Sequence, residues 1–205
     1  MALVRVTLGG KRLGYVRNNK AGSTTIINYL GQLLWNEEPT FHSGANVQDY
    51  CGDDSYIGRE KGFESYHKEL KECEIRIAVY RDPIDKIISG FYYCQEFKPH
   101  LNDLDNFLWG YEHYLKDNYI KVHCRTNTDM LGPDPSIYTH VWNMNDIDAK
   151  LLPFLEKLGG GKIQKTRLRE HSSRVITEAQ KPKAKEVMAI DYQNGWCKEL
   201  IPVKM

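Results

Sequence analysis

The chain has 205 residues and a mass of 23.8 kDa, a size typical of one domain, so we expect a single domain over residues 1–205. Hydrophobic residues make up 41% of the sequence and charged residues 27%, which excludes extended disorder and collagen-like repeats. No window approaches the roughly 18 consecutive apolar residues of a membrane span, and Arg5 lies where a secretory signal needs its apolar centre. We therefore expect a cytoplasmic protein with no membrane partner.

The net charge of +1 hides a local basic excess. Residues 162–185 carry eight Lys or Arg residues and two Glu residues. The same stretch contains no aromatic residue that could stack on a base, so we expect a localised anion site there and no nucleic-acid partner. A solvated basic surface without a ligand is the alternative.

The five cysteines are scattered along the chain, and none lies in a Cys-x-x-Cys pair. Zinc ribbons and redox motifs require such pairs. We interpret the cysteines as reduced thiols that act as small buried residues, and we expect no metal site.

In chain order, the first elements predicted are a hairpin and a helix. Gly9-Gly10 forms the turn between strands at 3–8 and 13–16, because glycine allows the positive φ angles of a tight turn. The apolar positions of residues 26–34 repeat with the period of an amphipathic helix. Residues 36–62 lack a sustained period and predict a long irregular connection.

A second strand and helix follow at 75–80 and 84–92, separated by Arg81-Asp82-Pro83. Beyond them we expect helices at 104–115, 146–158 and 182–196 and strands at 137–142 and 163–168. This alternation predicts an α/β fold with a mostly parallel central sheet flanked by helices. In such sheets ligands bind at the carboxyl ends of the strands, where both polar turns lie.

The first polar turn has the chemistry of a phosphate-binding loop. Gly22 lets the backbone approach an anion, and the helix that follows offers free N–H groups. Ser23, Thr24 and Thr25 add hydroxyl donors, and Lys20 adds a mobile charge. The turn differs from the nucleotide-triphosphate loop because its lysine precedes the glycine. Helix capping by Ser23 or Thr24 is the alternative.

The second turn places Arg81 at the end of a strand and Ser89 on the following helix, away from its apolar stripe. An arginine fork beside a hydroxyl is suited to a second phosphate. Taken alone, Arg81-Asp82 is equally consistent with a capping ion pair.

Together, the segments Lys20-Ala21-Gly22-Ser23-Thr24-Thr25 and Arg81-Asp82-Pro83 through Ser89-Gly90-Phe91-Tyr92 resemble sulfotransferases that use 3′-phosphoadenosine-5′-phosphosulfate (PAPS), especially the carbohydrate branch. In that family the first motif binds the 5′-phosphosulfate and the second binds the 3′-phosphate. Weaker similarities lie at His123, at 168–173 and at 189–192. Asn19 departs from the family, which commonly has proline before the lysine, and no membrane anchor precedes the motif.

The resemblance implies a three-layer, P-loop-like sulfotransferase fold and the transfer of a sulfuryl group from PAPS to an acceptor hydroxyl. A carbohydrate is the expected acceptor, while phenols, lipids and peptides stay open, as does the oligomeric state. The product is 3′-phosphoadenosine-5′-phosphate (PAP), and no metal is required. The residues implied in cofactor binding are Lys20, Ala21, Gly22, Ser23, Thr24, Thr25, Arg81, Ser89, Arg169 and Ser173.

Catalysis on this scheme needs a cation for the leaving oxygen and a base for the acceptor proton. Lys20 is the expected cation. His67 is the first candidate for the base and His42 the second, with Glu64, or none of these residues, as the alternatives. Two other functions stay open: a non-catalytic PAPS- or PAP-binding protein, and a kinase-like P-loop enzyme, which the loop spacing disfavours.

Overall fold

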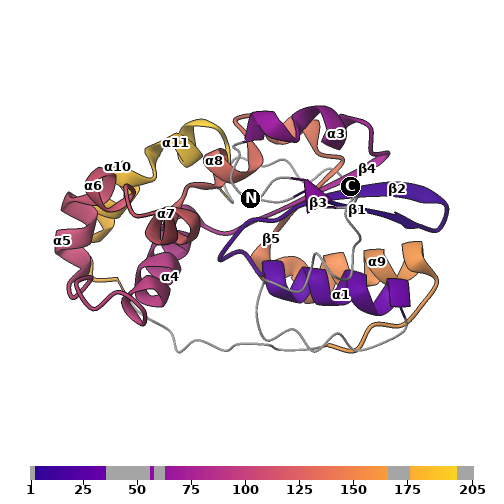
Figure 1. Ribbon diagram of the computed structural model, residues 1–205, viewed down its shortest axis with the longest axis horizontal. Coiled ribbons are helices and arrows are strands. Elements are labelled where there is room, and N and C mark those ends of the chain that lie inside the picture. The colour runs from indigo at the N-terminus through magenta and orange to yellow at the C-terminus, as the bar shows by residue number, and fades with distance from the viewer. Residues whose placement is uncertain (1–2, 36–55, 58–62, 166–175, 198–205) are drawn as a thin grey trace.

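The computed structural model describes residues 3–35, 56–57, 63–165 and 176–197. They form a five-stranded sheet with helices on both faces and a further group of helices to the left of the sheet in Figure 1. This arrangement confirms the α/β class. No helix within these ranges is long and apolar enough to cross a membrane.

The sheet is mixed, with strand order β3-β1-β2-β4-β5. Its strands are β1 (Leu3–Leu8), β2 (Lys11–Val16), β3 (Tyr56–Ile57), β4 (Ile75–Tyr80) and β5 (His140–Asn143). β2, β4 and β5 pair in parallel, whereas β1 is antiparallel to both of its neighbours. Because β2 and β4 are parallel neighbours, the turns that follow them lie at the same edge of the sheet.

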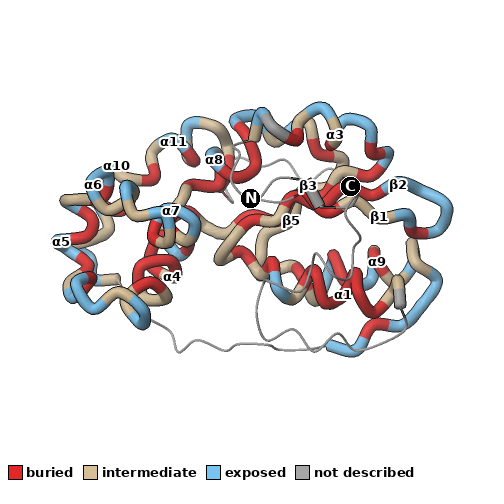
Figure 2. Tube along the Cα trace, viewed as in Figure 1, coloured by how far each residue is buried: buried red, intermediate tan, exposed pale blue. Residues whose placement is uncertain are grey.

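Helices cover the two faces of the sheet, and the side chains of β1, β2, β4 and β5 contribute to two cores. On one face lie α1 (Ser23–Trp35) and α9 (Leu152–Gly159), and on the other lie α3 (His67–Lys71) and α8 (Asn127–Leu131) (Figure 1). Ile77 and Val79 of β4 pack into the α1 side, and Ala78 packs into the α3 side. Figure 2 shows the central strands mostly buried and the outer turns of α3 exposed.

The remaining helices form a third core that does not include the sheet. They are α4 (Pro83–Gln95), α5 (Leu104–Trp109), α6 (Tyr111–Tyr114), α7 (Asn118–Cys124), α10 (Lys181–Val187) and α11 (Ala189–Gln193). Phe91, Phe107 and Ile120 are buried between them. α4 and α7 pack so closely that a Cβ at Gly90 would lie 2.5 Å from the carbonyl oxygen of His123. This close packing fixes α7 against the second strand-to-helix unit.

Several sequence predictions are confirmed. The hairpin turns at Gly9-Gly10, with φ angles of 54° and 77°. The strand at 75–80 and the helices after both polar turns are present, and Gly160 ends α9 in the left-handed conformation. The four described cysteines, Cys73, Cys94, Cys124 and Cys197, are free and buried, as expected.

Other predicted elements are wrong in extent. The helix predicted at 104–115 is divided at Gly110, which lies outside helical geometry and has low helix propensity. The closing helix is divided at Met188, and the helix predicted at 146–158 begins with a π-helical turn. The strand predicted at 137–142 comprises only His140–Asn143, and residues 163–165 of another predicted strand are not in a strand. Three short helices, α3, α7 and α8, were not predicted at all.

Candidate functional site

The two polar turns meet at the carboxyl ends of β2 and β4. Arg81 follows β4, and its Nη1 donates a hydrogen bond of 3.2 Å to the carbonyl oxygen of Lys20, in the turn after β2. The two turns are separated by about sixty residues in sequence, yet this bond joins them directly. The structure thus brings together the two residues on which the sequence prediction depends.

Lys20 has an unusual backbone conformation. Its φ angle is +64°, and it is the only non-glycine residue with positive φ in the described ranges. Its turn is closed by the Ala21 N–H, which donates to the carbonyl oxygen of Asn18 at 3.2 Å. A left-handed conformation costs an ordinary residue about 1–2 kcal/mol, and such strain often marks functional sites.

The conformation of Gly22 gives a reason for glycine other than the expected approach of an anion. Its φ is +74°, a left-handed value that favours glycine, and a Cβ at this position would also displace Cδ1 of Ile147, the flexible end of that side chain. The hydroxyl residues that follow differ in exposure: Ser23 is buried, Thr24 is exposed and Thr25 is half-buried.

The second turn begins α4 with a regular cap. The Asp82 carboxylate accepts from the N–H groups of Ile84 and Asp85 at 3.0 and 3.4 Å, and Pro83 occupies the first helical turn. Arg81 instead directs its guanidinium to the first turn, and its Nε is buried without a hydrogen-bond partner. Burial lowers the pKa of Arg81, and nearby Asp85 and Asp82 oppose the change.

One face of α4 leads from Arg81 to Lys20. Asp85, Ser89 and Tyr93 are spaced four residues apart, so their side chains share that face. Asp85 is close enough to Arg81 for the two charges to interact, and the Lys20 ammonium lies 3.9 Å from the centroid of the Tyr93 ring. Ser89, which is half-buried, is therefore on the face between the two basic residues.

A buried network of hydrogen bonds connects both turns and holds their backbone in place. Asn18 donates from Nδ2 to the carbonyl oxygen of Val79 (3.0 Å) and to Oδ1 of Asn127 (2.9 Å). Asn127 in turn donates to the carbonyl oxygen of Arg81 (2.9 Å). The Lys86 ammonium donates to Oδ1 of Asn18 at 2.7 Å. The sequence analysis did not identify this network, which fixes the backbone on both sides of the site.

Asp191 and Lys86 supply the opposite charges of this network. The Asp191 carboxylate accepts from the N–H groups of Asn127 and Thr128 at 2.7 and 2.6 Å, at the start of α8. Lys86 is fully buried, and burial lowers its pKa to about 8, with Asp191 opposing the change. Burial raises the pKa of Asp191, and Lys86 opposes that change. Asp191 belongs to a segment with a family resemblance, whereas no signal in the sequence pointed to Lys86.

His123, at the end of α7, lies beside the first turn. Its ring centroid is 4.5 Å from that of Tyr93 and 4.9 Å from that of Tyr119. Asn19 joins the turn to α7 by donating from Nδ2 to the carbonyl oxygen of Val122 at 3.0 Å. α7 therefore forms a wall of the site that the sequence indicated only through a weak resemblance.

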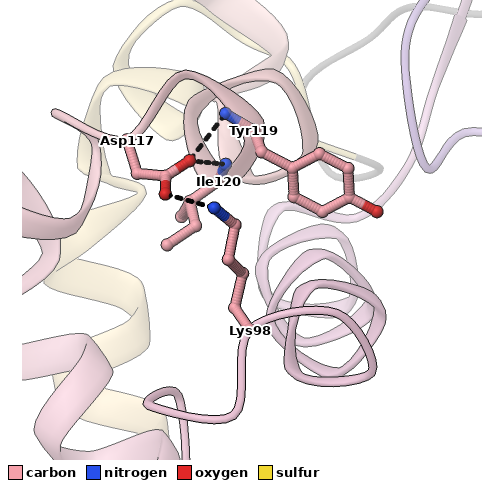
Figure 3. A network of polar contacts seen from close by, with 4 residues as sticks. All are labelled: Lys98, Asp117, Tyr119 and Ile120. Carbon is pink, nitrogen blue, oxygen red and sulfur yellow. Dashed lines mark hydrogen bonds and ion pairs between the residues drawn. The ribbon is translucent and has the colours of Figure 1, made fainter.

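The beginning of α7 is fixed by Asp117 (Figure 3). Its carboxylate accepts from the N–H groups of Tyr119 and Ile120 at 2.8 and 3.2 Å, and from the Lys98 ammonium at 2.7 Å. The hydrogen bond with Lys98 is the main cause that lowers the pKa of Asp117. Because α7 is short, a fixed first turn also fixes the position of His123.

Of the predicted catalytic bases and the remaining donor-binding residues, the structure describes only some. His67 begins α3, where its ring lies 4.8 Å from that of Phe63 and its Nε2 is buried without a hydrogen-bond partner. His67 thus makes a ring contact with Phe63. Glu64 is exposed. The predicted residues His42, Arg169 and Ser173 lie outside the described residues.

The expected anion site within 162–185 receives no support from its described part. Lys162, Lys181 and Lys183 form ion pairs with Glu156, Glu178 and Glu186. These pairs at the surface favour the alternative of a solvated basic surface.

Comparison with protein-family models, with curated proteins and with solved structures found no match for this chain. The site is therefore defined by its own geometry, on an α/β protein with a basic corner where two parallel strands end. Among the residues that the structure describes, no group of three or more His, Cys, Asp or Glu could hold a metal ion.

Proposed function

We propose that the protein is a sulfotransferase that moves a sulfuryl group from PAPS to a hydroxyl of an acceptor, with carbohydrates as the acceptor class. The observation that carries the proposal is the hydrogen bond between Arg81 and Lys20. It joins two basic strand-to-helix turns at one edge of the sheet, where α/β proteins bind their ligands. A ligand with two phosphate groups can therefore contact both turns.

The residues present suit such a ligand. The buried Nε–H of Arg81 has no acceptor, and leaving a buried donor unsatisfied costs about 1–3 kcal/mol. A phosphate oxygen would satisfy it, so Arg81 and Ser89 would hold the 3′-phosphate. The turn from Lys20 to Gly22 and the hydroxyls of Ser23, Thr24 and Thr25 would hold the 5′-phosphosulfate at the start of α1, whose free N–H groups favour anions. Ala21 contributes its backbone to this turn.

Lys20 would stabilise the leaving group. As the bond between sulfur and the phosphate oxygen breaks, negative charge grows on that oxygen, and a positioned ammonium lowers the barrier. The Tyr93 ring, 3.9 Å from the Lys20 ammonium, restricts that ammonium through a cation–π contact and so reduces the reorganisation needed.

The base that takes the acceptor proton is proposed on the resemblance. His67 stays the first candidate and His42 the second, and Arg169 and Ser173 would help to close the donor site.

The test is a sulfuryl-transfer assay with labelled PAPS and a panel of glycans, phenols and peptides, in which PAP formation is followed independently of the acceptor. We expect acceptor-dependent PAP release and calorimetric binding of PAP that ATP with Mg²⁺ does not displace. Ser89→Ala should weaken PAP binding, whereas Ser136→Ala, which removes an exposed hydroxyl elsewhere, should not. PAP binding without transfer would indicate a binding protein, and preference for ATP with Mg²⁺ would indicate a kinase.

A further inference from the structure

Two basic side chains outside both motifs lie at the Lys20 turn. Arg17 follows β2 directly, and His123 comes from α7, about one hundred residues later. Both residues act on each other electrostatically, since Arg17 and Lys20 are the two charges that bear on the His123 imidazole. A cluster of three cations or potential cations therefore surrounds one turn.

The cluster shares an aromatic wall. The Lys20 ammonium and the His123 ring both contact Tyr93, at 3.9 and 4.5 Å from its centroid. On α7, the ring centroid of Tyr119 lies 4.9 Å from that of His123, and the Lys98 ammonium lies 5.8 Å from the centroid of the Tyr119 ring. Within the described part of the chain, the groups that face His123 from the turn, from α4 and from α7 are thus cations and phenols, and no carboxylate is among the charges that act on it.

Two polar atoms of this cluster are unsatisfied. Nε of Arg17 and Nδ1 of His123 are both buried, and neither has a hydrogen-bond partner. Most buried polar groups in proteins are hydrogen-bonded, so two unpaired atoms beside one strained turn need an explanation. An anion bound at the turn would supply oxygen acceptors for both and would compensate the excess of positive charge.

We propose that Arg17 and His123 complete the anion site of the Lys20 turn and that its ligand is a tetrahedral dianion of the sulfate or phosphate-ester class. The Arg17 guanidinium donates to the anion, and His123 takes up one proton from solvent and donates from its imidazolium. The assignment of this anion to the 5′-phosphate of bound PAP, or to the phosphosulfate of PAPS with its two charges on adjacent tetrahedral groups, rests on the proposed function, whereas the binding of a dianion does not.

Proton uptake follows from the charges. In the free protein, burial together with the charges of Lys20 and Arg17 lowers the pKa of His123 to about 4. A dianion cancels the two positive charges of Lys20 and Arg17 that lower this pKa, and an opposite charge within about 4–6 Å shifts a pKa by about 1–3. Between the free and the bound pKa, each anion bound takes up a proton, so the affinity falls as the pH rises, by up to about tenfold per pH unit.

The test uses inorganic sulfate, which stays a dianion over the whole range, so that any proton comes to the protein. Histidine ring signals are titrated by NMR in sodium sulfate and in sodium chloride of equal ionic strength. Sulfate should raise the pKa of His123 by about 1 or more, as expected for an opposite charge nearby. Exposed His113 serves as the internal reference and should not change.

Two variants separate charge from packing. His123→Gln keeps a hydrogen-bond donor but cannot titrate, so the pH dependence of sulfate affinity should disappear while the thermal midpoint stays close to that of the wild type. Arg17→Gln should weaken sulfate binding by about tenfold or more, because a hydrogen bond to a charged group is lost. His113→Gln is the matched control and should keep both the affinity and its pH dependence.

The same titrations with PAP distinguish this inference from the proposed function. If PAP binds but neither PAP nor sulfate changes the pKa of His123, the role of His123 is contradicted and the sulfotransferase proposal stands. If sulfate raises the pKa of His123 but PAP does not bind, the anion site stands and the sulfotransferase proposal is contradicted. Failure of both ligands to bind overturns both.

Discussion

The two strand-to-helix turns of the site are built in different ways. The turn at 81–83 is shaped mainly by its own residues: Asp82 caps α4 with its own carboxylate, Pro83 occupies the first helical turn, and the buried network adds the hydrogen bond from Asn127 to the carbonyl oxygen of Arg81. The turn at 17–22 depends on distant residues, since Ile147 packs against Gly22 and Asn18 is held by the buried network. The first turn also keeps Lys20 in a strained conformation. We conclude that the first turn is the more sensitive of the two to changes elsewhere in the protein.

The largest effect is expected from Lys20→Met, which removes the charge of the strained turn and keeps the length of the side chain. If Lys20 stabilises the leaving oxygen, kcat should fall by about 10²- to 10³-fold, the cost of losing one positioned donor in a transition state. PAP affinity should change much less. Steady-state kinetics and calorimetry measure the two quantities separately.

Lys121→Met is the control for that variant, because Lys121 is an exposed lysine on α7. Its turnover should equal that of the wild type. An unchanged kcat in Lys20→Met would remove Lys20 from the mechanism.

The next largest effect is expected from a change in the buried polar network that holds the two turns. Asp191→Ala leaves the N–H groups of Asn127 and Thr128 without an acceptor and the buried Lys86 without its opposing charge. The free energy of unfolding should fall by about 3 kcal/mol or more, as when one partner of a buried charged network is removed. Urea denaturation measures it, and the control is Asp105→Ala, which removes an exposed carboxylate on α5 outside this network and should change the free energy of unfolding by about 0.5 kcal/mol or less.

The pH dependence of stability tests Lys86 in the same network. Its pKa in the folded protein is about 8, below the ordinary value of 10.5 that it has in the unfolded chain. Between these values the unfolded chain binds the proton and the folded protein does not, so this residue makes stability rise with pH.

The free energy of unfolding of the wild type minus that of Lys86→Met should therefore increase from about pH 8 to 10.5 and stay level below this window. Taking the difference removes the contributions of titrating groups that do not interact with Lys86. Parallel curves for the two proteins across this window would contradict a buried, neutralisable lysine.

The smallest effect concerns the local turn. Asp82→Ala removes the cap of α4 and should reduce the free energy of unfolding by about 1 kcal/mol. Asp103→Ala removes an equivalent cap from α5, away from the site, and should cost about the same. Only Asp82→Ala should also weaken PAP binding, because it loosens the backbone next to Arg81. Equal PAP affinity in the two variants would show that this cap does not support the site.

The parts of the fold that could be predicted are those determined by residues close together in the sequence. The hairpin, β4 and the helices α1 and α4 follow from turn glycines, apolar periods and the cap at Asp82-Pro83, all of which act within a few residues. The motifs also placed Lys20 and Arg81 at neighbouring strand ends, and the structure joins them.

What the sequence did not reveal depends on contacts between distant residues. Asn18 meets Lys86 and Asn127 across separations of 68 and 109 residues, and no period or motif encodes such pairings. Helices α3, α7 and α8 have five to seven residues, too short for an apolar period to identify. His123 belongs to one of them, and its role at the Lys20 turn follows only from the packing of α7 on α4.

We propose that the two turns bind opposite ends of one doubly phosphorylated adenosine. The decisive experiment is calorimetric titration of the wild type and Arg81→Ala with PAP and with 5′-AMP, which lacks the 3′-phosphate. We expect Arg81→Ala to weaken PAP binding by about 10- to 150-fold, the loss of a charged hydrogen-bond set of about 1.5–3 kcal/mol, and to leave 5′-AMP binding unchanged. Equal losses for both ligands, or no binding of PAP to the wild type, would contradict it.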